Sequence, residues 1–104
     1  MRAAITAAMQ AQQLEVLAYP PAGALPVQIG EPQPGNNCSL SANSGLPALS
    51  LPIGFSADGL PMGMEWLGVE FSDARLLALG HAFESVAPSR EAPAATPPLQ
   101  SVNQ

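Results

Sequence analysis

The order of apolar and polar residues predicts a helix followed by a short strand at the start of the chain. Residues 2–13 are rich in Ala, Gln and Met and contain neither Gly nor Pro, which favours a helix. Residues 14–19, LEVLAY, form a compact apolar run closed by two prolines, which is typical of a short buried strand. A signal peptide over residues 2–9 is the alternative, but its apolar part is barely long enough, and the glutamines that follow suit a solvated helix.

Proline and glycine then predict a long irregular loop over residues 20–37. Five prolines and three glycines fall within it, and regular structure does not persist at that density. Loops longer than about 12 to 15 residues are usually functional, disordered or laid over another surface. Residues 37–44, NCSLSANS, follow as one or two helical turns that end at Gly45 and Pro47.

Two apolar runs, residues 48–55 and 60–67, predict an antiparallel β-hairpin. The segment between them contains Asp58-Gly59, a strong turn signal because both residues tolerate positive φ. Pro52 and Pro61 cannot donate to a ladder, so each should lie at an edge, a bulge or a strand start. Gly54 and Gly63 suggest the close approach of another backbone.

A second helix is predicted to begin after Ser72 and to end before Pro88. Ser72 is a favourable N-cap, and Asp73 lies in the first turn, where the helix dipole favours an acidic residue. Gly80 lowers helix stability by about 1 kcal/mol relative to Ala. The tail, residues 88–104, is predicted to be an extended strap or a disordered end. The expected buried face of the helix consists of Leu76, Leu79, Gly80, Phe83 and Val86.

Composition adds that the chain is poor in charge. Of its 104 residues 47% are apolar but only 11% are charged, against about 25% in an ordinary soluble domain. This shortage predicts that something else covers part of the surface. A net charge of -5 with three Arg excludes a phosphate-binding footprint, so no nucleic-acid partner is expected. No apolar run approaches the roughly 18 residues of a membrane span, so no membrane partner is expected either.

Residue types that could support hydrolysis are present but form no convincing set. Cys38 and His81, with Asn36 or Asn37, contain the elements of a cysteine hydrolase, yet Cys and a His with apolar neighbours are more often buried structural residues. No nucleophile elbow supports a serine triad. The candidates for such a triad are Ser39, Ser41, Ser44 and Ser50, with Asp73 and His81.

Two further groups of residues are candidates for binding roles. Glu65, Glu70 and Asp73 suggest a cation site, but Glu65 is expected to point outward from a strand while Asp73 belongs to a helix start. Trp66, with Met62 and Met64, could line a pocket, but burial in the strand core is the more common fate.

At residues 45–84 the string GLPALSLPIGFSADGLPMGMEWLGVEFSDARLLALGHAFE resembles the C-terminal region of the amidase signature family, the Ser-Ser-Lys amide hydrolases. LEVLAYP and GNNCSLSANSG upstream and SREAPAATPPL downstream extend the resemblance to residues 3–99. It implies an enzyme of several hundred residues with a mixed central sheet, in which two serines and a lysine perform the chemistry. This chain contains no lysine, and its serines do not match that signature. Chemistry that requires a lysine therefore cannot be completed by this chain alone.

The sequence thus predicts an α/β fold: a fragment of a mixed central sheet flanked by helices, in the order helix, strand, long loop, β-hairpin, helix. Residues 1–104 are interpreted as the C-terminal portion of a cytoplasmic amidase domain, supplying scaffold and pocket wall. The Pro-rich loop 20–37 and the turn over residues 37–44 would border a substrate pocket. No catalytic residue, cofactor or metal ligand is assigned. The expected partner is the N-terminal part of an amidase, with a small amide substrate only in the complete enzyme. The alternative is a non-catalytic module that oligomerises through its apolar hairpin face.

Overall fold

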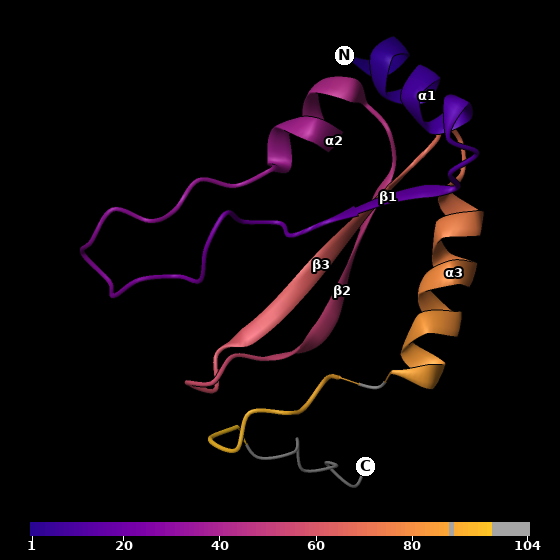
Figure 1. Cartoon of the computed structure of the whole chain (residues 1–104). Coiled ribbons are helices and arrows are strands. Elements are labelled where there is room, and N and C mark those ends of the chain that lie inside the picture. Colours follow the sequence, from indigo (N-terminus) through magenta and orange to yellow (C-terminus); the bar gives the residue numbers. More distant parts are fainter. Residues whose placement is uncertain (88, 97–104) are drawn as a thin grey trace, which may run out of the picture.

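The computed structural model describes residues 1–87 and 89–96, and three helices and three strands follow one another along this part of the chain (Figure 1). Pro88 and residues 97–104, which belong to the predicted tail, lie outside the described residues. The predicted α/β class and the order of elements are confirmed. The elements are α1 (Arg2–Ala11), β1 (Val16–Tyr19), α2 (Cys38–Ser44), β2 (Ala48–Phe55), β3 (Pro61–Gly68) and α3 (Asp73–Val86).

The three strands form one sheet in the order β1-β3-β2, with both pairings antiparallel. Ala18 and Leu49 lie opposite Trp66 on either side of β3, so these three residues share one face of the sheet. Tyr19 and Ser50 lie opposite Glu65 and share the other face. The Gly68 N–H donates to the Pro47 carbonyl at 2.9 Å, which ties the start of β2 to the end of β3.

The hairpin turn differs from the expected form in one respect. Only Gly59 has positive φ, at 76°, whereas Asp58 does not. The Gly59 N–H donates to the Ser56 carbonyl at 2.9 Å, and the Ser56 N–H donates to the Leu60 carbonyl at 2.8 Å. This pattern is a three-residue loop with a left-handed glycine, which needs a single residue at positive φ.

Proline lies within the hairpin where its missing N–H is tolerated. Pro52 is on an edge strand next to a register shift, and Pro61 begins β3, as predicted. The suggestion of close backbone approach at Gly54 is wrong. Gly54 has φ of 130° and open space where a side chain would lie, so it serves the bulge. Gly63 has ordinary contacts with Pro21 and Leu51 and needs no special approach.

Helix α3 packs against the sheet through a glycine. A Cβ on Gly80 would lie 2.5 Å from Cδ2 of Leu49 and 3.3 Å from Cδ2 of Leu51. The residue that costs helix stability therefore allows the helix to approach β2 closely. Trp66 and Phe83 meet edge to face, with ring centroids 5.4 Å apart. The prediction for Val86 is wrong: it is 83% exposed, because the last turn of α3 offers this side chain no partner among the described residues.

Both helix ends next to the hairpin are closed by local geometry. Gly45 ends α2 in the left-handed conformation, as predicted for a helix C-terminus. Ser72 precedes α3, but its hydroxyl donates to the Val69 carbonyl at 2.7 Å and makes no side-chain cap. Asp73 lies in the first turn as expected.

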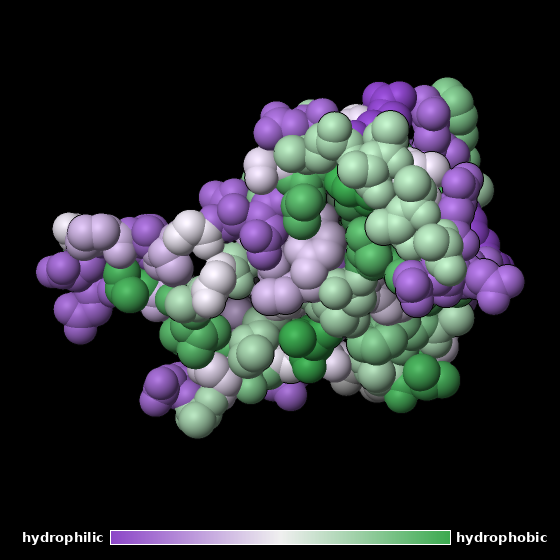
Figure 2. All heavy atoms as spheres, turned by 45° about the horizontal axis from the view of Figure 1, so that its top comes forward, coloured by the Kyte–Doolittle hydropathy of each residue, from purple (hydrophilic) through white to green (hydrophobic). Residues whose placement is uncertain are grey.

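The long loop between β1 and α2 leaves the body of the molecule as an arm (Figure 1). Its base is closed where the Gly23 N–H donates to the Gly35 carbonyl and the Asn37 N–H donates to the Pro21 carbonyl, both at 2.9 Å. Figure 2 shows that the arm is largely hydrophilic, while hydrophobic residues gather over the body and reach its surface.

The core is small for a chain of this length. Within residues 1–87 and 89–96 the buried apolar side chains are Met9, Leu46, Leu51, Leu67 and Leu76. The accessible surface is 7768 Å², whereas a compact monomer of 10.7 kDa would expose about 5,500 Å². The chain therefore leaves much of its surface unburied.

Candidate functional site

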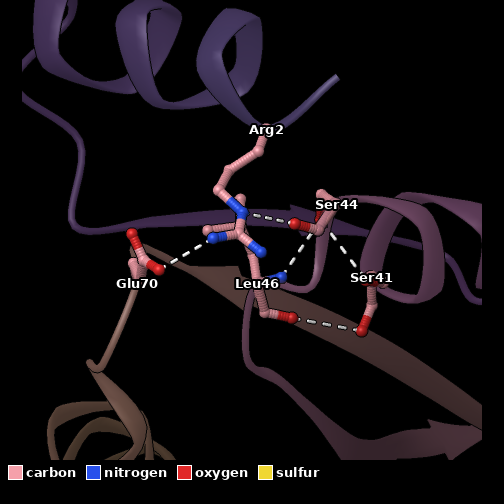
Figure 3. Close-up of polar contacts among 5 residues, drawn as sticks. All are labelled: Arg2, Ser41, Ser44, Leu46 and Glu70. Atoms are coloured by element: carbon pink, nitrogen blue, oxygen red, sulfur yellow. Dashed lines mark hydrogen bonds and ion pairs between the residues drawn. The ribbon is translucent and has the colours of Figure 1, made fainter.

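A cluster of polar contacts surrounds the corner at Gly45 and Leu46 (Figure 3). Arg2 Nε donates to the Ser44 carbonyl at 2.6 Å, and Nη1 pairs with Glu70 Oε1 at 2.7 Å. One guanidinium thus joins α1, the end of α2 and the segment after β3. Both ionic side chains are 48% exposed, so the ion pair itself contributes at most about 1 kcal/mol to stability.

Two serines of α2 hold the same corner from the other side. Ser41 Oγ donates to the Leu46 carbonyl, and Ser44 Oγ accepts from the Leu46 N–H, both at 3.2 Å. Ser44 is buried, and its hydroxyl donates to the carbonyl of Leu40. These hydroxyls are engaged with backbone groups, and no base among the described residues is hydrogen-bonded to them. The corner is therefore a structural joint and lacks an activated nucleophile.

The other candidates for a serine triad are also dispersed. Ser39 and Ser50 are exposed, on α2 and β2 respectively, and Asp73 begins α3. His81 is exposed on α3. A triad requires a hydrogen-bonded nucleophile and base, and the described contacts of these residues include no such pair.

Cys38 and His81 are not brought together. Helices α2 and α3, which carry them, lie on either side of the strands (Figure 1). The expectation that both are buried is wrong, because Cys38 and His81 are exposed. The neighbouring asparagines shape the loop instead. Asn36 Oδ1 accepts from the Cys38 N–H at 3.1 Å, and Asn37 Nδ2 donates to the Pro20 carbonyl at 2.7 Å.

A second polar contact lies on the sheet face turned away from α3. The Tyr19 hydroxyl donates to Glu65 Oε1 at 2.6 Å. Burial, together with the hydrogen bond to this carboxylate and its charge, holds the pKa of Tyr19 well above its usual range. The phenol therefore stays protonated at neutral pH and acts as a donor. Glu65 points to the sheet face opposite to α3, as expected from the alternation along the strand, and is half-buried there in its contact with Tyr19.

The three carboxylates proposed for a cation site do not form one. Glu65 is bound by Tyr19, Glu70 is bound by Arg2, and Asp73 stands in the first turn of α3. Within residues 1–87 and 89–96 the His, Cys, Asp and Glu side chains form no group of three that could hold a metal ion.

The three candidate pocket-lining residues have different positions. Trp66 is half-buried against Phe83, in keeping with the expected strand core. Met64 is half-buried and Met62 is 38% exposed. A shallow hollow lies between the start of the long loop and Pro61, Met62 and Gly63. The loop therefore borders a concave surface, and the residues that line it include no acid, base or nucleophile.

The pattern of residues could not reveal Arg2 and Tyr19. Their partners Glu70 and Glu65 are 68 and 46 residues away in sequence. Neither pair has a local spacing that predicts it, because the contacts depend on how the strands and helices are assembled.

Comparison with known proteins identifies the context of these elements. The model of the family described as Amidase matches residues 1–77. The chain belongs to the amidase family. It resembles part of the amidase-family hydrolases that act on carbon–nitrogen bonds. An indoleacetamide hydrolase of Agrobacterium vitis is 51% identical over 57 residues, which make up 55% of this chain and 12% of that hydrolase.

Two other amidase-family relatives have the same partial relation. A glutamyl-tRNA(Gln) amidotransferase polypeptide from Ralstonia nicotianae is 49% identical over 41 residues, 39% of this chain and 8% of that polypeptide. The peptide amidase from Stenotrophomonas maltophilia matches with a TM-score of 0.73 and 34% identity, over 84% of this chain and 18% of that enzyme. The chain spans about a tenth of the length of these curated relatives and less than a fifth of the solved enzyme.

No helix among the described residues is long and apolar enough to cross a membrane.

Proposed function

We propose that this chain is the C-terminal portion of an amide-hydrolysing domain and that it is catalytically silent by itself. The observation that carries the proposal is that the family match takes in most of this chain, whereas the chain spans only a small share of the enzymes it matches. The family match takes in residues 1–77, yet the chain corresponds to only 18% of the peptide amidase. The catalytic serines and lysine implied by the family resemblance would belong to the missing N-terminal part. This chain would supply strands, helix α3 and one wall of the substrate pocket.

The surface of the chain supports this proposal. Its radius of gyration is 16.9 Å, compared with about 13 Å for a compact domain of 100 residues. Apolar side chains such as Phe71, 89% exposed, and Leu77, 63% exposed, lie in water. A partner that covers them would remove the unfavourable hydration of this apolar area.

In this proposal, amide hydrolysis takes place only in the reassembled enzyme. The Tyr19 phenol is protonated, the hydroxyls of Ser41 and Ser44 serve the backbone, and no described base can activate them. A small amide substrate would bind only when the missing part completes the pocket. A cytoplasmic location is part of the proposal, since the single cysteine, Cys38, is exposed and free, and such thiols persist in reducing compartments.

The test is reconstitution in trans. The probe is the Stenotrophomonas maltophilia peptide amidase lacking the segment that this chain matches, co-expressed with residues 1–104. Release of ammonia from a peptide amide is expected from the pair and from neither part alone. A control co-expression uses an unrelated acidic protein of similar size. A monodisperse monomer without affinity for the truncated amidase would count heavily against the proposal, and amide turnover by the purified chain alone would refute it.

A self-associating module is the second candidate, favoured by the apolar hairpin. Ile53, Phe55, Leu60 and Met62 are each between 36% and 43% exposed near the hairpin turn. Exposed apolar patches of this kind mark interfaces or aggregation. Native mass spectrometry separates the two cases, because a module would give one defined oligomer without any added partner.

A further inference from the structure

Arg2 connects three segments that lie far apart in the sequence (Figure 3). Its Nε donates to the Ser44 carbonyl at the end of α2, and its Nη1 pairs with Glu70 Oε1 after β3, although these residues are 42 and 68 positions away. The first turn of α1, where Arg2 lies, gives no local reason for a cation, because the helix dipole disfavours positive charge at a helix N-terminus. The side chain of Arg2 is therefore placed for its distant partners.

The surface that receives the guanidinium is shaped for it. The Ser44 carbonyl is one of the last four of α2, which have no partner inside the helix, and the last turn of α2 contains no basic residue. Gly45 follows in the left-handed conformation, and a Cβ on it would lie 2.7 Å from Nη2 of Arg2. The Ser44 carbonyl, the Gly45 backbone and the Glu70 carboxylate, here called the Arg2 seat, thus suit a planar group with several N–H donors.

Hydrophobic packing contributes little to the position of α2. This helix has seven residues, and within the described part of the chain only Ser44 among them is buried. The Arg2 seat therefore has a large share in fixing the helix, since it ties the end of α2 to α1 and to the segment after β3. A helix of this length spans about 10 Å and is stiff, so a displacement at one end is carried to the other.

The other end of α2 holds the base of the long arm. The Asn37 side chain donates to the Pro20 carbonyl at 2.7 Å, and the Asn37 N–H donates to the Pro21 carbonyl at 2.9 Å. Pro20 and Pro21 begin the stretch of loop that forms the shallow hollow together with the first residues of β3. A displacement of α2 would therefore move one side of this hollow relative to the other.

We propose that Arg2 is a positioning residue for amide hydrolysis in the reassembled enzyme: it holds α2, and α2 holds the loop that forms a wall of the substrate pocket. The inference rests on the proposed function and specifies which residue of this chain sets the geometry of that wall. Arg2 acts through α2 and does not touch the substrate. A misplacement of about 1 Å can lower the rate of an enzyme about 100-fold, so a loosened wall is measurable in the kinetics.

The experiment compares two arginine–glutamate pairs that are both about half exposed. Arg2→Ala breaks the pair that reaches α2. The matched control is Arg75→Ala, which breaks the pair between α3 and Glu15 and touches neither α2 nor the arm. Each chain is co-expressed with the truncated peptide amidase, the complex is purified, and kcat and KM for a peptide amide are measured per mole of complex.

Arg2→Ala is expected to lower kcat/KM per mole of complex by about tenfold or more, mainly through a higher KM, because the pocket wall is less well placed. Arg75→Ala should stay within about twofold of the parent chain. Arg2→Lys should recover only part of the loss, since an ammonium group keeps the charge but lacks the planar set of donors. A merely structural role would lower the yield of complex and leave its KM unchanged.

Glu70→Gln is a milder variant that decides the question if Arg2→Ala forms no complex. It removes the charge of the Arg2 seat and keeps an oxygen acceptor for Nη1, so a raised KM is again expected. Unchanged kinetics in the complexes of Arg2→Ala and Glu70→Gln, or an equal loss in Arg75→Ala, overturns the positioning role and leaves the proposed function intact if the parent chain restores hydrolysis. Failure of the parent chain to restore hydrolysis overturns both.

Discussion

The described helices cover the two faces of the sheet to different extents. On one face α3 covers the strands closely, with Gly80 against Leu49 and Leu51 and with Phe83 on Trp66. On the other face no described helix covers the strands in this way, and α1 lies beside one end of the sheet (Figure 1). Beyond that end the face presents the half-buried Tyr19–Glu65 contact and the exposed Ser50.

The difference shows which part of the core this chain contains. The α3 face is built from residues 48–83 and is completed by local connections. The opposite face has α1 only beside one end of the strands and is open over the rest among the described residues. A self-contained domain would cover both faces, because each needs a second layer to bury its apolar side chains. The chain thus contains a complete pair of layers, sheet and helix, on the α3 face and only part of such a pair on the other face.

The largest effect on stability is expected at one end of the strands, on the sheet face turned away from α3. Leu67 is fully buried there, so Leu67→Ala should lower the free energy of unfolding by about 2–5 kcal/mol through lost burial and the cavity left behind. Denaturant unfolding followed by Trp66 fluorescence measures it. Leu77→Ala, at an exposed position, is the control and should change stability by about 0.5 kcal/mol or less. Equal effects of the two would show that this end of the face is not packed in the chain.

Close packing on the α3 face predicts the next effect. In Gly80→Leu the side chain would have to displace Leu49 and Leu51, so a loss of about 1–3 kcal/mol is expected. Ala78→Leu, on the exposed side of α3, is the matched control. Gly80→Ala should be nearly neutral, because the gain of about 1 kcal/mol in helix propensity opposes the shift of the Leu49 side-chain end. Tolerance of Leu at both positions would contradict the close approach of α3.

Local patterns predicted the hairpin and the helices because their signals lie within a few residues. The bounds of β2 agree with the prediction, and β3 is shifted by one residue. Turn chemistry at Gly59 and the proline positions act locally, so they can be interpreted from the string of residues. The class and family context were also recognisable, because the string over residues 45–84 is specific.

Burial and long-range contacts were predicted less well. Cys38, His81 and Val86 were expected inside because such residues are usually buried in complete domains, and this chain spans less than a fifth of the length of the solved amidase. The Arg2–Glu70 and Tyr19–Glu65 contacts follow from strand order and register, to which no short motif corresponds. Gly80 was predicted only to lower the stability of the helix, because the close approach to β2 that it allows depends on the strand beneath it.

The polar contact of the open face can be tested through pH. Tyr19→Phe removes the hydrogen bond to Glu65 and should cost about 1 kcal/mol at neutral pH. The raised pKa of Tyr19 determines the direction in which stability changes with pH. Above pH of about 10 the unfolded phenol ionises while the folded one stays neutral, so stability should be constant below that pH and fall above it. The chain contains no lysine and one tyrosine, so this slope belongs to Tyr19.

Phenolate absorbance and denaturant midpoints, each measured against pH, provide the two readouts. Tyr19→Phe should lack the alkaline decline. A folded phenol that ionises near pH of about 10 would mean that the contact with Glu65 does not form.

The smallest effect is expected at Trp66, on the well-covered face. Its indole N–H is buried and has no hydrogen-bond partner among the described residues, which costs about 1–3 kcal/mol. Trp66→Phe removes this donor and keeps an aromatic ring against Phe83, but leaves space where the larger ring was. The two terms oppose each other, so stability should change by less than about 1 kcal/mol, as measured by circular dichroism. Trp66→Ala, which also removes the ring contact, should be clearly destabilising. A loss in Trp66→Phe as large as in Trp66→Ala would mean that the indole N–H has a hydrogen-bond partner within the chain after all.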